Sequence, residues 1–215
     1  MQWDELSKLL NNNQYKMGNT VDYFSSSVLI PLVAYKGEFR VLFEVRSADI
    51  GWQPGDICFP GGRIEPGDTD AKATAIRETC EELGIEATKI QVFGSMNYIV
   101  SQIGALVYPY VGFLAETDFT GLNSAEVGRV FSVPLSFLMQ AKPVVGRMET
   151  ATKPVGDFPW HLMPSGYPRD WKERSFYNVY FYQYKEFVIW GLTARILHDF
   201  IEICKKLNVM QSLPK

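Results

Sequence analysis

Apolar residues occur mainly in short runs along the chain, which is typical of β-strands rather than of long helices. The clearest runs span 28–35 and 40–45, and the turn residues Lys36, Gly37 and Glu38 separate them. This spacing predicts a β-hairpin. Further strands are expected at 90–99, 105–114, 130–133, 144–148, 158–163, 177–184 and 187–190, the last two as a second hairpin.

One segment combines a helical pattern with signals at both of its ends. Asp70–Leu83 carries small alanines, Gly84 can end it, and Asp68, Thr69 or Asp70 can cap its N-terminus. Further helical segments are expected at 3–10, 134–139 and 192–206. Because helices interrupt the strands, the pattern predicts an α/β fold with helices packed on a mixed β-sheet.

Composition agrees with one well-filled globular domain, since 47% of the 215 residues are apolar and 14% are aromatic. We expect residues 1–26 to form an N-terminal helix and loop extension, and residues 27–215 to form the domain itself. The net charge of −3 does not suit a protein that follows a phosphate backbone, so nucleic acid is not an expected partner. The longest apolar stretch, near 28–35, is too short to span a membrane.

The three cysteines, Cys58, Cys80 and Cys204, are widely spaced and form no CxxC pair. A disulfide framework or a structural zinc site is therefore not expected. The N-terminus lacks the basic and apolar regions of a secretory signal. These features predict reduced thiols in a cytoplasmic protein, and they leave open whether the protein forms a homodimer.

Three glutamates cluster on one face of the helix that we expect at 70–83. Glu78, Glu81 and Glu82 are spaced i, i+3 and i+4, opposite an apolar face that contains Ile76 and Leu83. Their charges repel one another, and the helix dipole disfavours anions near the C-terminus. A hard divalent cation such as Mg²⁺ or Mn²⁺ would remove both penalties, because it prefers carboxylate oxygens. The alternative is an ordinary solvated acidic face.

The surrounding sequence resembles the Nudix box, which reads Gly, five residues, Glu, seven residues, then Arg-Glu-U-x-Glu-Glu-x-Gly-U with U apolar. Here the segment 77–85 reads Arg-Glu-Thr-Cys-Glu-Glu-Leu-Gly-Ile. Two departures stand out. Arg77 follows Gly62 by 15 positions, one more than the pattern gives, so that Asp68 takes the place of the first Glu. Thr79 is polar at an apolar position.

The flanking sequence is similar to the coenzyme A pyrophosphatase branch of this family. The segment 55–62 has its Gly-x-x-x-Phe-Pro-Gly-Gly pattern, but Ile50, Gly51 and Trp52 stand where its second Arg is expected. That departure bears on the identity of the substrate if the missing Arg holds phosphate. The other segments that resemble this branch are 41–47, 126–135 and 189–195.

The resemblance implies the Nudix fold, an α/β/α sandwich with a mixed β-sheet, and metal-dependent pyrophosphate hydrolysis. Carried over, Glu78 and Glu82 are the leading ligands for Mg²⁺ or Mn²⁺, with Glu81 as a third and the Gly62 carbonyl as a fourth. Glu78, Glu81 and Glu126 are the expected catalytic carboxylates. The general base is either Glu78 or Glu126, and the sequence leaves that choice open.

The substrate that the resemblance implies is a small nucleotide derivative, coenzyme A or acyl-CoA, cleaved to 3′,5′-ADP and (acyl-)4′-phosphopantetheine. Arg46, Gly61, Gly62 and Arg63 are the expected substrate contacts. One alternative is a Nudix pyrophosphatase that acts on ADP-ribose or dinucleoside polyphosphates. The other is a non-catalytic Nudix-like regulator that only binds nucleotide, although the intact acids of the box argue against it.

Overall fold

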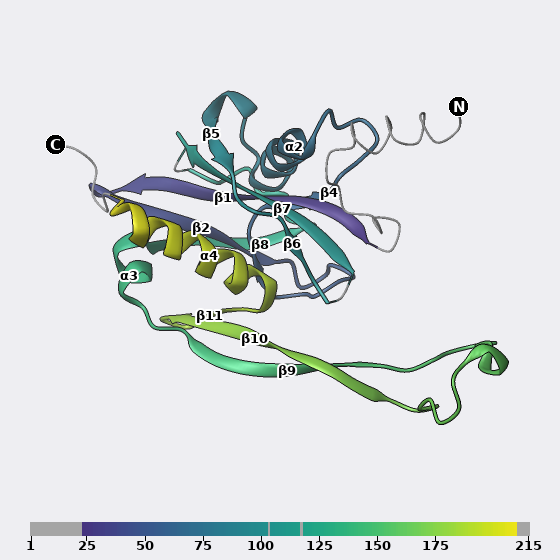
Figure 1. Ribbon diagram of the computed structural model, residues 1–215. Helices are drawn as coiled ribbons and strands as arrows, with labels where there is room; N and C mark the ends of the chain where they lie inside the picture. Colours follow the sequence, from purple (N-terminus) through teal and green to yellow (C-terminus); the bar gives the residue numbers. More distant parts are fainter. Residues whose placement is uncertain (1–22, 103, 117, 210–215) are drawn as a thin grey trace, which may run out of the picture.

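The computed structural model of the chain describes residues 23–102, 104–116 and 118–209. The helix that we predicted at 3–10 lies outside this part. Figure 1 shows a main sheet with helices on both of its faces, and a smaller second sheet that extends into a long arm. The layers confirm the predicted α/β/α sandwich. The α-helices of the described residues are α2 (Ala71–Leu83), α3 (Leu135–Gln140) and α4 (Gly191–Leu207).

The main sheet is mixed and contains eight strands. They are β1 (Phe24–Tyr35), β2 (Glu38–Arg46), β3 (Ile57–Cys58), β4 (Gly61–Arg63), β5 (Ile90–Ser95), β6 (Ile99–Val100), β7 (Ala105–Leu114) and β8 (Val127–Pro134). The main path runs β3-β2-β1-β7-β5, while β4 pairs with β1, β6 with β7 and β8 with β2. β1 pairs in parallel with β7 and antiparallel with β2, which makes the predicted first hairpin correct.

The single strand predicted at 90–99 is two strands, β5 and β6, which both pair with β7. The register of β5 shifts between Val92 and Gly94, as at a β-bulge. Such a shift bends a strand and ends regular pairing. The short 3₁₀ helix η2 (Ala87–Lys89) leads from α2 into β5.

The second sheet contains β9 (Val144–Thr152), β10 (Lys172–Tyr184) and β11 (Phe187–Trp190), with β10 in the middle. The predicted hairpin of 177–184 and 187–190 is confirmed. The prediction of a strand at 158–163 is wrong, because this segment contains the 3₁₀ helix η3 (Trp160–Leu162). Pro159 and Pro164 flank η3 and lack the N–H group that a strand ladder needs. β9 and β10 run outward together as the arm that carries this segment (Figure 1).

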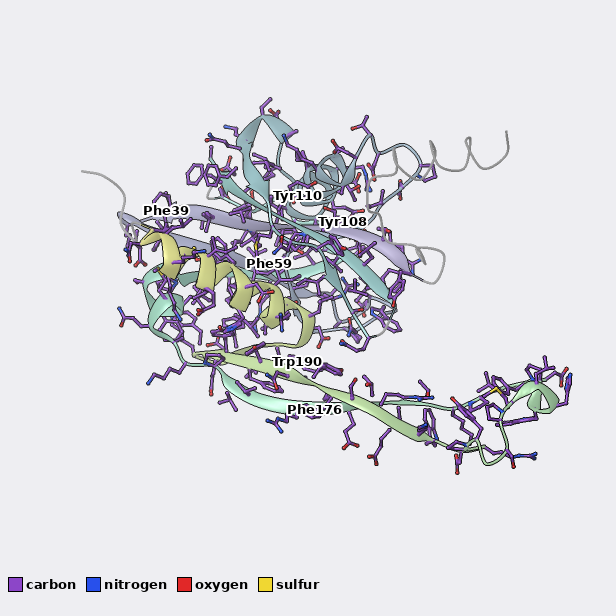
Figure 2. All side chains as sticks on the ribbon, viewed as in Figure 1. Phe39, Phe59, Tyr108, Tyr110, Phe176 and Trp190 are labelled. Carbon is purple, nitrogen blue, oxygen red and sulfur yellow. The ribbon has the colours of Figure 1, made fainter. Side chains whose placement is uncertain are left out.

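Side chains of the main sheet are buried on both faces. On β1, Leu29 and Val33 belong to the core cluster under α2, while Ile30 belongs to the cluster under α3 and α4. On β2, Leu42 belongs to the cluster under α2 and Phe43 to the cluster under α3 and α4. Figure 2 shows the aromatic side chains of the main sheet within the body and Phe176 out on the arm. In the part of the chain that is described, no helix has the length and apolar character needed to cross a bilayer.

Local signals fix both ends of α2, with Asp70 as the N-cap among the three predicted candidates and Gly84 as the predicted end. Asp70 is the N-cap, and its carboxylate accepts a hydrogen bond of 2.8 Å from the Ala73 amide. Gly84 ends the helix with a φ of 66°, which is a left-handed conformation. A Cβ at Gly84 would also collide with the Gly121 carbonyl, so glycine is required here for two reasons. The helix is thereby held at a defined length above β1 and β4.

Candidate active site

The predicted buried face of α2 is wrong in part. The buried residues are Thr74, Ala75, Thr79, Glu82 and Leu83, so one of the three glutamates faces the sheet instead of solvent. Thr79 fits because its hydroxyl donates to the Ala75 carbonyl at 2.6 Å within the same helix. The polar residue at an apolar position of the box is therefore satisfied without a partner from the sheet.

Glu82 is buried because the main chain of β4 receives its carboxylate. The Gly61 amide donates to Glu82 Oε2 at 2.8 Å, and the side chain is only 4% exposed. Burial, together with the nearby Glu78 and Glu126 carboxylates, raises the pKa of Glu82 to about 8, although the Gly61 hydrogen bond lowers it. The surroundings of Glu82 therefore destabilise its ionised form, and a bound cation would stabilise that form.

Glu78 lies directly over the backbone of β4. A Cβ added at Gly62 would collide with the Glu78 carboxylate and would displace this flexible end of the side chain from its place over β4. Glu78 Oε1 is 2.9 Å from Arg77 Nη1. Burial raises the pKa of Glu78 above its ordinary value, although Arg77 lowers it. The Gly61-Gly62 pair thus accommodates two carboxylates from α2.

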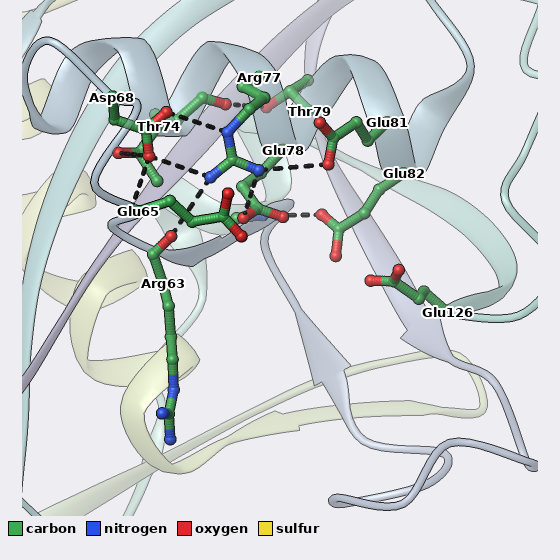
Figure 3. Close-up of polar contacts among 12 residues, drawn as sticks. Arg63, Glu65, Asp68, Thr74, Arg77, Glu78, Thr79, Glu81, Glu82 and Glu126 are labelled. Carbon is green, nitrogen blue, oxygen red and sulfur yellow. Dashed lines mark hydrogen bonds and ion pairs between the residues drawn. The ribbon is translucent and has the colours of Figure 1, made fainter.

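Arg77 joins the loop of the box to the helix (Figure 3). Its Nε and Nη2 bond the two oxygens of Asp68, each at 3.0 Å, in a bidentate pair. Asp68 also accepts hydrogen bonds from the Thr74 hydroxyl and the Glu65 amide. The Arg77 hydrogen bonds hold the pKa of Asp68 well below its ordinary value. The aspartate at the altered box position therefore anchors the arginine that contacts Glu78.

Glu44 is a buried carboxylate that the sequence analysis did not single out. It lies on β2, is 1% exposed, and its Oε1 has no hydrogen-bond partner among the described residues. Burial, and then the Glu82 charge, raises the pKa of Glu44 well above its ordinary value. A signal was present in the sequence, since Glu44 follows the unbroken apolar run 41–43. Such a run predicts a strand buried on both faces, and a carboxylate on that strand is buried with it.

Glu126 reaches the same place from the loop before β8. Its carbonyl accepts the Ser47 amide at 2.8 Å, and its carboxylate accepts the Asn123 side-chain amide at 3.2 Å. Its charge contributes to the raised pKa values of Glu44, Glu78 and Glu82. These four residues, Glu44, Glu78, Glu82 and Glu126, are called the carboxylate cluster below.

Glu81 stands apart from the carboxylate cluster. Its side chain is 56% exposed and lies 3.2 Å from Arg77 Nη1 (Figure 3). Among the described residues, no three His, Cys, Asp or Glu side chains are already arranged around a common point as in a formed metal centre. Glu78 is turned toward Arg77 and Glu82 toward Gly61, so an ion would have to compete with both of these contacts.

The two arginines expected to contact substrate occupy different surroundings. Arg46 ends β2, donates to the Trp52 carbonyl at 3.1 Å, and lowers the pKa values of Glu44 and Glu82. Arg63 has its guanidinium 4.8 Å from the centre of the Phe24 ring, and Figure 3 shows it pointing away from the carboxylates. The structure therefore brings Arg46, and not the Arg63 side chain, to the carboxylate cluster.

A pocket of about 730 Å³ adjoins the carboxylate cluster. Arg46 and Cys58 contribute to its wall, and both interact with Glu44. Other walls come from the segment 97–102, from β10 and from the start of α4. The volume falls in the range of about 300–1,000 Å³ that small-molecule sites occupy. Burial, with the Glu44 charge, raises the pKa of the Cys58 thiol, which does not suit a nucleophile.

The sequence of the chain is similar to those of several known proteins. The NUDIX domain model matches residues 24–143. The mouse peroxisomal coenzyme A diphosphatase NUDT7 is 38% identical over 148 residues, which are 67% of this chain and 62% of that protein. An uncharacterized Nudix hydrolase, NudL, of Photorhabdus laumondii is 33% identical over 174 residues, 81% of each chain.

Two further similarities are shorter. The human mitochondrial coenzyme A diphosphatase NUDT8 is 37% identical over 121 residues, 55% of this chain and 51% of that protein. This chain therefore spans less than two thirds of the length of either diphosphatase. Among solved structures, a Caenorhabditis elegans Ap4A hydrolase complex aligns with a TM-score of 0.44 and 21% identity, covering 52% of this chain and 80% of that one.

Proposed function

The chain belongs to the Nudix hydrolase family, and we propose that it hydrolyses the pyrophosphate bond of coenzyme A or acyl-CoA. The products are 3′,5′-ADP and (acyl-)4′-phosphopantetheine. The observation that carries the proposal is the carboxylate cluster against the Gly61-Gly62 backbone, next to a pocket of ligand size. Similarity to coenzyme A diphosphatases of mouse and human supports the choice of substrate.

The carboxylate cluster fits a divalent cation chemically. Its donors are carboxylate oxygens, as Mg²⁺ and Mn²⁺ prefer, and Glu44 Oε1 lacks a partner among the described residues. Glu78 and Glu82 would hold the ion, with the Gly62 carbonyl and Glu81 as the further ligands that the sequence predicts. When bound, the ion neutralises phosphate oxygens and lowers the pKa of water.

The protein's own side chains would position the ligands of the ion, bind phosphate and accept a proton. Arg77 holds Glu78 over β4, and Asp68 holds Arg77. Arg46, which lines the pocket, offers a positive charge to a phosphate there. Glu126 is the better placed of the two candidate bases, because the Asn123 amide is its hydrogen-bond donor while Glu78 is paired with Arg77. It would accept a proton from the attacking water.

Hydrolysis assays on the full chain test the proposal. Coenzyme A and acetyl-CoA are incubated with Mg²⁺ or Mn²⁺, and the products are identified by mass. We expect 3′,5′-ADP and the phosphopantetheine product only when metal is present. Turnover of ADP-ribose or a dinucleoside polyphosphate in place of coenzyme A would keep the reaction class and refute the substrate. Absence of hydrolysis on every substrate would favour the nucleotide-binding regulator.

The variant Glu78→Gln tests the role of the box acids. It keeps the size of the side chain beside Gly62 but removes the charge that a cation needs. We expect kcat to fall by at least about 100-fold, because electrostatic contacts in active sites have effects of that order. Steady-state rates measure it, with Glu86→Gln as control, since Glu86 lies beyond the helix and accepts from Thr88. Full activity of Glu78→Gln would refute the metal assignment.

Other expectations from the sequence also stay predictions. They are the boundary between residues 26 and 27, the cytoplasmic location, the absence of nucleic-acid and membrane partners, and the question of a homodimer. Cell fractionation and sedimentation would address the location and the oligomeric state.

A further inference from the structure

The pocket beside the carboxylate cluster contains a second arginine on a different wall. Arg46 lines it from the end of β2, and Arg195 lines it from α4. Among the described residues that line this pocket, no lysine accompanies these two arginines. A ligand in the pocket is thus offered positive charge from two separate elements, beside the Asp56 and Asp199 carboxylates that also line it.

We propose that Arg195 binds a phosphate of the substrate that is separate from the pyrophosphate under attack. In coenzyme A this group is the 3′-phosphate of the ribose. Arg195 then decides specificity, since it favours nucleotides with a 3′-phosphate over ADP-ribose and other diphosphates that lack one. The inference rests on the proposed function, which puts the pyrophosphate at the carboxylate cluster.

The guanidinium of Arg195 is available for such a contact. Its Nε bonds Asp199 Oδ2 at 3.2 Å, which uses one of its five N–H groups. This pair is solvent-exposed, with 48% of the Arg195 side chain and 36% of the Asp199 side chain accessible. Exposed pairs contribute little net stability, so a phosphate can compete for the guanidinium at small cost. A planar guanidinium also binds two phosphate oxygens at once.

The position of Arg195 is fixed relative to the carboxylate cluster. Thr193 donates to the Ile57 carbonyl at 3.0 Å, which ties the start of α4 to the strand that carries Cys58. Ala194 and Ile196, the neighbours of Arg195 in sequence, are buried in the core. Arg195 therefore projects from a rigid part of the helix. A residue that binds a second phosphate at a set distance from the first needs such a fixed position.

The rest of the pocket suits the nucleoside between these phosphates. Tyr98, Tyr177 and Trp190 line it from three different segments, and Tyr98 and Trp190 are 55% and 44% exposed. Aromatic rings of this kind offer flat faces on which a purine base stacks. Arginine and aromatic side chains together match the chemistry of a 3′-phosphoadenosine group.

The test compares coenzyme A with dephospho-coenzyme A, which lacks only the 3′-phosphate. We expect Arg195→Ala to lower kcat/KM for coenzyme A by roughly 10- to 100-fold, mainly through KM, as loss of a charge-assisted contact does. The value for dephospho-coenzyme A changes less than about twofold, and Arg195→Lys restores part of the preference. Lys205→Ala is the matched control, because Lys205 forms an exposed ion pair with Glu202 on the same helix.

Two results would overturn the proposal. One is an equal loss on both substrates in Arg195→Ala, which would indicate a structural role. The other is a wild-type enzyme without preference for coenzyme A. Calorimetric binding of 3′,5′-ADP and of 5′-AMP separates this inference from the proposed function. An Arg195-dependent preference for 3′,5′-ADP in a chain that hydrolyses no substrate would support the phosphate site and refute the activity.

Discussion

At the residue scale, Glu82 combines an acidic side chain with a buried position. Its pKa of about 8 lies above the ordinary 4.5, mainly because burial disfavours the charged form. The folded protein therefore holds a proton on Glu82 across a pH range in which the unfolded chain has lost it. Stability that this group contributes is present below about pH 4.5 and is lost as the pH rises toward 8.

The variant Glu82→Gln tests the direction of this pH dependence of stability. Glutamine can still accept the Gly61 amide but does not titrate, so the metal-free variant should gain stability over the wild type as the pH rises from 5 to 8.5. The expected difference is one to a few kcal/mol, since each pKa unit is worth about 1.4 kcal/mol. Urea unfolding in EDTA measures it, with the exposed Glu81→Gln as control. A difference that shrinks with pH would contradict the raised pKa.

The sequence predicts which residues of the box and its flanks come together. It does not reveal burial or side-chain contacts that depend on the folded chain. Arg77, Glu78, Glu82 and Glu126 come together as expected from the box and its flanks. Glu44 was missed, because a glutamate in a strand is ordinarily expected to face solvent. The guanidinium of Arg63 lies over the Phe24 ring, a contact that spacing along the chain does not reveal, and its predicted contact with substrate stays a prediction.

At the element scale, the ends of α2 follow from local chemistry and its faces do not. The sequence predicts Gly84 as the C-terminal end and offers Asp70 as one of three candidate N-caps, because caps depend on a few adjacent residues. Burial of Thr74 and Thr79 was not predicted, because apolar periodicity cannot identify polar groups that bond within their own helix or loop. The order of strands in the sheet could also not be predicted from the pattern of the sequence, since pairing between distant strands leaves no local pattern.

Substitution of Gly84 by alanine should destabilise the protein. Alanine is strained at a φ of 66°, and its Cβ would meet the Gly121 carbonyl. We expect a loss of about 1–3 kcal/mol in the free energy of unfolding, measured by urea denaturation. Gly67→Ala is the control, because nothing lies within 4 Å of a Cβ there, and its effect should stay within about 0.5 kcal/mol. Equal effects at both positions would argue against the close approach.

At the scale of the whole molecule, the arm separates into a base and a tip. The base belongs to the pocket, since Met148, Tyr177 and Asn178 line it. The tip, residues 153–171, lies far from the body in Figure 1 and carries exposed apolar side chains such as Val155 and Trp171. We therefore expect the chemistry proposed for the carboxylate cluster not to depend on the tip.

Removal of the tip tests this separation. Thr152 and Lys172 are paired across the two strands, so an Asn-Gly turn can join them in place of residues 153–171. We expect kcat and KM for coenzyme A to stay within about twofold of the wild type, because loops tolerate large changes in length. Steady-state kinetics and the unfolding midpoint check it. A shortened chain that folds but has lost hydrolysis would show that the tip acts in the reaction.

The parallel pairing of β1 with β7 has a consequence for the order of folding. Its partners, such as Ser27 and Tyr108, are 81 positions apart, and the whole box lies in the chain between them. Contacts of such long sequence separation form late, because the entropy of closing the loop must be overcome first. The helix of the box can appear early from its own caps, whereas β4 depends on β1 for its place. During refolding, helical circular dichroism should return before hydrolysis does.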